Sequence, residues 1–226
     1  MEHEIKSKPD FAFLSLRLNN GEQVIAESGS MVGMSTELDM QTNMKGGLKG
    51  ALKRALGGES LFMNTYTATA DNQRLDLAPA TPGDVEHLTL DGNNVLVQSG
   101  SYMSSSPGVE VDAKWSGARG FFSGEGLFML RCSGHGDLWI SSYGAIHAVD
   151  VQGTYVVDTG HIVAFDDSLS YQLKSIGGLK SLLFSREGLV CEFSGSGRLW
   201  IQTRCSVPLV GFLHPFRSIK PQNHAN

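Results

Sequence analysis

The stretches "SGHGDLWI" (133–140) and "SGSGRLWI" (194–201) decide the fold, since they agree at six of eight positions and lie 61 residues apart. The block before each is also shared: "SGEGLFML" (123–130) precedes the first, "SREGLVCE" (185–192) precedes the second, and "GGESLFMN" (57–64) is a third copy. Self-similarity at a fixed spacing is the signature of tandem structural units. The chain is therefore predicted to repeat one unit three times.

A second set of blocks extends each unit upstream, namely "VIAESGSMVG" (24–33), "VLVQSGSYMS" (95–104) and "VVDTGHIVAF" (156–165). Gly29, Gly100 and Gly160 become equivalent in this alignment, as do Glu59, Glu125 and Glu187. The repeat is too long for a solenoid. We predict one compact domain over 1–226, made of three similar lobes around a pseudo-threefold axis. The units run over roughly 11–83, 84–144 and 145–210, and 211–226 forms a C-terminal tail.

Apolar residues alternate with polar ones in the segments that lead into the shared blocks. "FAFLSLRL" (11–18) places Leu14, Leu16 and Leu18 on one face, a period of two that is typical of β-strands. Short strands separated by glycine predict an all-β fold, either a double-stranded β-helix or a barrel-like sandwich, with short helical connectors. The G-x-G pieces at 134–136 and 195–197 are predicted to be hairpin turns.

One predicted connector, "GGLKGALKRALGGESLF" (46–62), is basic and amphipathic, and its cations together with the preceding lysine are Lys45, Lys49, Lys53 and Arg54. Such a helix can bind an anionic membrane surface or an anionic partner. It can equally be a cap that closes one end of a lobe and leaves its lysines in water. Both interpretations stay open from the sequence.

Trp139 and Trp200 are predicted to lie on the opposite strand face from their leucine and isoleucine neighbours. They either offer a stacking platform for a base or an aromatic ligand, or they pack between lobes or subunits. The three equivalent glutamates could form an acidic ring, or could each accept hydrogen bonds at a turn. With Lys45, Lys49, Lys53 and Arg54, the two tryptophans make up the candidate interaction surface.

Composition excludes several classes of function. A net charge of −5 over 226 residues does not favour a dedicated nucleic-acid binder. Three cysteines without a C-x-x-C, and seven histidines without a ligand spacing, predict neither a disulfide framework nor a metal site. Nucleotide-binding and hydrolase motifs are missing, so we predict no cofactor and no catalytic residues. The charged start and the lack of a long apolar run predict a cytoplasmic protein.

The blocks "ESGSMVGM", "GGLKGALKRALGGESLFMNTYTA", "SGEGLFML" and "RLWIQTR" resemble the family named for altered inheritance of mitochondria, the mitochondrial biogenesis proteins. The resemblance covers roughly residues 10–210. It implies a fold similar to the tryptophan RNA-binding attenuation protein, built as three similar lobes. It implies no catalytic residues and no agreed ligand, and the ligand and RNA residues of that fold do not map onto this chain.

These observations predict a non-catalytic assembly or interaction protein that acts through its surfaces or through oligomerisation. The expected partner is another copy of the chain, in a trimer or a larger ring, or a different protein. Nucleic-acid binding by analogy of fold is one alternative, and peripheral membrane association through residues 45–56 is another.

Overall fold

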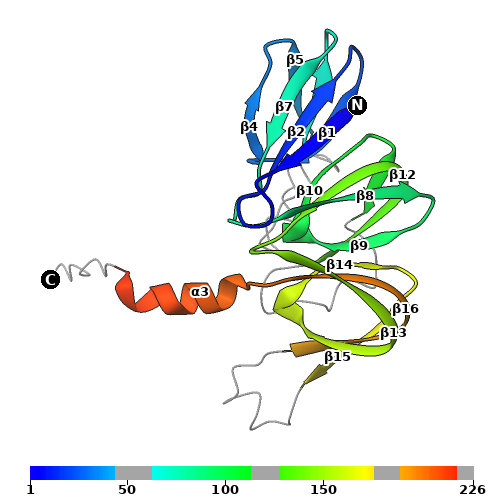
Figure 1. Cartoon of the computed structure of the whole chain (residues 1–226), viewed down its shortest axis with the longest axis vertical. Coiled ribbons are helices and arrows are strands. Elements are labelled where there is room, and N and C mark those ends of the chain that lie inside the picture. Colours follow the sequence, from blue (N-terminus) through cyan, green and yellow to red (C-terminus); the bar gives the residue numbers. More distant parts are fainter. Residues whose placement is uncertain (44–62, 113–127, 176–188, 218–226) are drawn as a thin grey trace, which may run out of the picture.

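The computed structural model describes residues 1–43, 63–112, 128–175 and 189–217. The predicted helical connectors, including 46–62 and 177–184, lie outside these residues. The described chain is mostly β, with one short α-helix near its C-terminus (Figure 1). The all-β class predicted from the sequence is therefore confirmed.

We divide the strands into three groups by their order in the chain. The first group is β1 (Glu2–Lys6), β2 (Phe13–Leu18), β3 (Gln23–Glu27), β4 (Met31–Met34), β5 (Leu38–Asn43), β6 (Met63–Ala68) and β7 (Gln73–Leu77). The second is β8 (Val85–Asp91), β9 (Val95–Gln98), the 3₁₀ turn η1 (Ser99–Ser101), β10 (Tyr102–Ser105), β11 (Val109–Asp112) and β12 (Met129–Ser141). The third is β13 (Ile146–Asp158), η3 (Thr159–His161), β14 (Ile162–Asp166), β15 (Ser170–Ser175) and β16 (Leu189–Gln202). The helix α3 (Ser206–Leu213) and the turn η4 (His214–Phe216) follow.

The described strands form two antiparallel sheets. One has the order β1-β2-β7-β4, and the path through the other is β13-β16-β14-β9-β12-β10-β3-β6-β5, with β11, β15 and β8 attached beside it. The first and third groups are thus joined only through the second in this sheet, and Figure 1 shows the groups in a row along the long axis. The predicted closure around a threefold axis is not what the described residues form.

Alternating burial follows the predicted period. Leu14, Leu16 and Leu18 of β2 are buried, and the residues between them are half-buried or exposed. Side chains on successive strand positions point to opposite faces, so a strand with one buried face must alternate in this way. Three clusters of buried apolar residues result, one centred on each strand group.

The predicted hairpin turns at 134–136 and 195–197 are wrong, because both lie inside long strands. In β12, Gly134 pairs with Val109 of β11, and the next residue, His135, pairs with Asp91 of β8. The strand bends where it exchanges one partner for another, and glycine permits the bend because Gly134 has φ +104°. In the first group the same region is broken into β6 and β7, which belong to different sheets.

Candidate interaction surface

Trp139 and Trp200 are buried, with 0% and 6% of their surface exposed. Each ring packs into the core of the preceding strand group: Trp139 of β12 into the first core beside the β2 leucines, and Trp200 of β16 into the second. The neighbours of Trp139, Leu138 and Ile140, lie in the second core instead, so the predicted opposite facing is confirmed. The rings are not open to a nucleic-acid base, and their placement is that of packing between groups.

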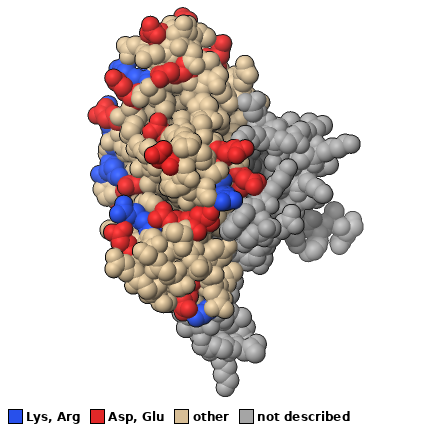
Figure 2. Space-filling view, turned by 90° about the vertical axis from the view of Figure 1, so that its right-hand side faces the viewer, with Lys and Arg blue, Asp and Glu red and all other residues tan. Residues whose placement is uncertain are grey.

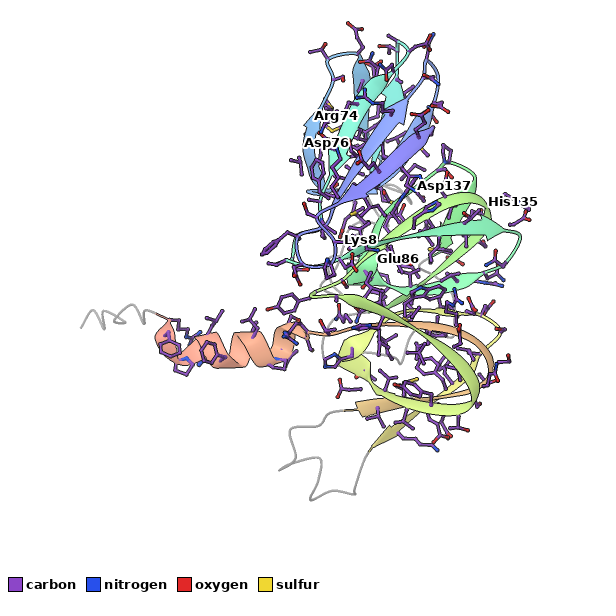
Figure 3. The ribbon with its side chains drawn as sticks, in the orientation of Figure 1. Lys8, Arg74, Asp76, Glu86, His135 and Asp137 are labelled. Atoms are coloured by element: carbon purple, nitrogen blue, oxygen red, sulfur yellow. The ribbon has the colours of Figure 1, made fainter. Side chains whose placement is uncertain are left out.

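The first group has Asp76 where the later groups have tryptophan. The Asp76 carboxylate forms an ion pair with Nε of Arg74 at 2.8 Å (Figure 3). It also accepts a 2.8 Å hydrogen bond from the Ser15 hydroxyl. Trp139 and Trp200 each enter the core of another strand group, whereas the Asp76 carboxylate is held by residues of its own sheet. A charged side chain that is partly buried needs such partners.

Trp139 also takes part in an aromatic cluster that joins the two sheets. The His3 ring from β1 lies 4.2 Å from the His87 ring of β8, and both lie within 5.5 Å of Trp139, centroid to centroid. Nε2 of His87 is 2.8 Å from Oδ1 of Asp137. Since His3 belongs to the four-stranded sheet and the other residues to the larger one, these rings help to fix one sheet against the other.

The His3 side chain is exposed overall, but the loss of water where neighbouring residues pack against it lowers the pKa of His3 below its ordinary value of 6.5; the nearby His87 lowers this pKa further, and Asp137 opposes the change. The unfolded chain therefore binds this proton more readily than the folded chain. The contribution of neutral His3 to the free energy of unfolding is fully present above pH 6.5. It decreases as the pH falls from 6.5 to the lowered pKa of His3.

We expect wild type to lose more stability than a His3→Gln variant when the pH is lowered from 7.5 to 5.5. The difference should be small, because the His3 side chain stays exposed. Urea unfolding at the two pH values measures it, with His147→Gln as a control at an exposed histidine. If wild type and His3→Gln lose equal amounts of stability, the pKa of His3 is not lowered in the folded chain.

A polar groove of about 570 Å³ lies beside Trp200, between β8 and the β13–β16 pair. Nε of Arg198 pairs with Asp150 at 2.8 Å, and the Arg198 backbone N–H donates to Asp166 at 2.7 Å. Asp150 is thus paired with a cation, and Asp166 accepts a backbone hydrogen bond. Within the described ranges, no group of three or more His, Cys, Asp or Glu side chains could hold a metal ion.

Two of the three cysteine thiols are buried in the cores. Burial raises the pKa of both Cys132 and Cys191 to about 12, so neither thiol ionises readily near neutral pH. Both thiols are buried, whereas Cys205 is partly exposed.

The cationic part of the predicted surface, Lys45, Lys49, Lys53 and Arg54, lies outside the described residues, and so do the three equivalent glutamates. Figure 2 shows Lys and Arg interspersed with Asp and Glu over the described part of one face, not gathered in a basic stripe. A stripe of that kind is the usual footprint of phosphate binding. Nucleic-acid binding and membrane binding through residues 45–56 stay predictions.

Sequence reasoning missed the most exposed apolar feature, the helix α3. None of its residues is buried, and the exposed fractions reach 61% for Val210, 66% for Phe212 and, just beyond the helix, 74% for Phe216. Figure 1 shows α3 projecting from the strand groups. The sequence signal was the run "VPLVGFL" with proline in the first turn, a position that suits a helix start.

Comparison with known proteins places these features in a family. A family model described as mitochondrial biogenesis AIM24 matches residues 3–204. The chain belongs to the AIM24 family. The matched region ends just before α3, so the exposed helix lies beyond the part that the family model describes.

Two streptococcal relatives resemble this AIM24 chain over most of its length. An uncharacterized protein, M6_Spy0233 of Streptococcus pyogenes serotype M6, is 27% identical over 213 residues, which is 90% of this chain and 86% of the relative. The crystal structure of SPYM3_0169 from Streptococcus pyogenes has a TM-score of 0.79 at 26% identity, covering 96% of this chain and 99% of that one. In the part of this AIM24 chain that the structure describes, no helix has the length and apolar character needed to cross a membrane.

Proposed function

We propose that this AIM24 protein is a non-catalytic assembly or interaction protein, and that it acts by associating with itself or with another protein. The observation that carries this proposal is α3, an apolar helix with every residue exposed. A helix that is apolar on all sides is normally buried, and contiguous exposed apolar surface on soluble proteins marks interaction sites. The helix therefore needs a partner to cover it.

The residues at equivalent positions of the three groups support the same proposal, because each of them has a structural role. Trp139 and Trp200 fill cores, and Asp76 is held by an ion pair within its own sheet.

We also propose that the three groups descend from one unit. The register is shifted at the same place in each: between Met31 and Gly33, between Tyr102 and Ser104, and between Ile162 and Ala164.

Size exclusion coupled to light scattering, together with capture of partners from the native cell by the tagged full chain, tests the proposal. We expect either a mass above the 24.4 kDa of one chain or a stoichiometric partner protein. Deletion of residues 206–226 should reduce that association, because it removes the exposed helix. A strict monomer at high concentration that also captures no stoichiometric partner would contradict the proposal.

A further inference from the structure

The charges around α3 differ from those of the rest of the chain. All 23 Asp and Glu residues precede residue 193, whereas the segment 193–226 contains four basic residues, Arg198, Arg204, Arg217 and Lys220. Arg204 and Arg217 flank α3 and η4, and no charged Asp, Glu, Lys or Arg lies between them. The helix thus presents an apolar surface with a basic residue at each end. Charge complementarity favours an apolar partner surface that carries carboxylates.

The first strand group carries such a surface. We define the methionine strip as residues 31–40, where the large apolar side chains of Met31, Val32, Met34 and Met40 are all exposed. The strip also contains the exposed residues Glu37 and Asp39 but no Lys or Arg. Methionine is flexible and polarisable, and it is common on surfaces that adapt to a partner.

The strip lies on strands that end both sheets. β4 is the last strand in the order β1-β2-β7-β4, and β5 is the last strand of the larger sheet, so among the described strands neither outer edge is paired. Exposed apolar side chains on such an edge favour contact with another chain. The length of α3 also matches that of β4. The eight residues of α3 span about 12 Å, and the four residues of β4 span about 13 Å.

The two surfaces do not meet within one chain. α3 follows β16 of the third group and has no buried residue, while the strip belongs to the first group. Figure 1 shows β4 and α3 at different heights along the molecule, with α3 projecting away from the strands. The described residues therefore carry two exposed apolar surfaces of opposite charge character.

We propose that α3 of one copy docks on the methionine strip of a second copy. This inference rests on the proposed function and names its partner. The second copy is favoured because one contact covers both surfaces and places Arg204 and Arg217 near carboxylates. An anionic lipid surface would cover α3 alone, and it would leave the acidic strip exposed. Reciprocal docking gives a closed dimer, and head-to-tail docking gives a ring or a filament.

The test measures self-association of the full chain by light scattering over a concentration series. Val210→Ser with Phe212→Ser in α3, and separately Val32→Ser with Met34→Ser in the strip, should each raise the apparent dissociation constant at least tenfold, as expected for central apolar contacts. All four side chains are exposed, so the urea unfolding midpoint should stay unchanged. Phe11→Ser, at an exposed residue outside both surfaces, is the matched control.

Charge reversal separates this proposal from lipid binding. Arg204→Glu with Arg217→Glu should weaken association, and so should Glu37→Lys with Asp39→Lys. Combining the four substitutions should restore association to within about threefold of wild type, because each charge again meets its opposite. Association that is unaffected by the helix and strip variants overturns the inference and leaves the proposed function standing.

Two other outcomes also overturn the inference. One is a wild-type chain that stays monomeric but floats with vesicles of phosphatidylcholine and phosphatidylserine through α3. The other is a monomer that captures a different protein through α3, which would leave the proposed function intact. A monomer that captures nothing contradicts both proposals.

Discussion

Replacing Trp139 with alanine is expected to lower the free energy of unfolding by about 3–5 kcal/mol, the usual cost of truncating a large buried aromatic residue. Trp139 is wholly buried, and it is the side chain by which β12 fills the core of the first strand group. Removing the ring leaves a cavity between leucines of β2 and also removes the aromatic partner of His3 and His87. Urea unfolding followed by circular dichroism measures the change.

Two further variants make this result interpretable. Trp139→Phe keeps a ring and removes an indole N–H that has no hydrogen-bond partner among the described residues, so it should cost only about 1–2 kcal/mol. Phe11→Ala, at an exposed aromatic residue, should change stability by no more than about 0.5 kcal/mol. A Trp139→Ala variant as stable as Phe11→Ala would show that the ring does not fill the first core.

Replacing Gly134 with alanine is expected to cost about 3–4 kcal/mol, from two separate causes. Its φ of +104° is unfavourable for any residue with a Cβ, and that Cβ would lie 2.4 Å from the backbone oxygen of Gly108. A backbone atom cannot rotate away as a flexible side chain can, so β11 and β12 would have to separate where they are paired.

Gly153 provides the matched control for Gly134. Its φ is +100°, nearly the same, but no atom lies within 4 Å of the position that a Cβ would take. Gly153→Ala should therefore cost only the backbone strain, about 1–2 kcal/mol. If thermal and urea unfolding give equal losses of stability for the two variants, the Gly108 oxygen does not add to the cost of a side chain at position 134.

Local patterns were enough to predict the strands and the two faces of the tryptophan-bearing segments. Alternation placed Leu14, Leu16 and Leu18 together, and it separated Trp139 from Leu138 and Ile140, because side-chain direction in a strand depends only on position. The burial of both tryptophans did not follow from alternation, since it depends on a neighbouring strand group supplying a core.

The errors came from features that depend on tertiary contacts. Glycines at 134 and 136 suggest a hairpin turn in isolation, but β11 and β8 hold the chain extended on both sides of the bend. The helix α3 escaped prediction because its eight residues include one proline and one glycine, and after Ser206 none is polar, so it lacks the periodic polar face by which a surface helix is recognised.

Trp139 and Trp200 each pack into the core of the strand group that precedes them in the chain, and this order affects folding during translation. The first core lacks Trp139 until a ribosome has passed the end of the second group's β12, and the second core lacks Trp200 until β16 has emerged. Nascent chains usually fold from their N-terminal end as each domain is completed. The first and second cores must therefore each wait for the next strand group to be translated, and a nascent chain that stops before β16 lacks the tryptophan of its second core.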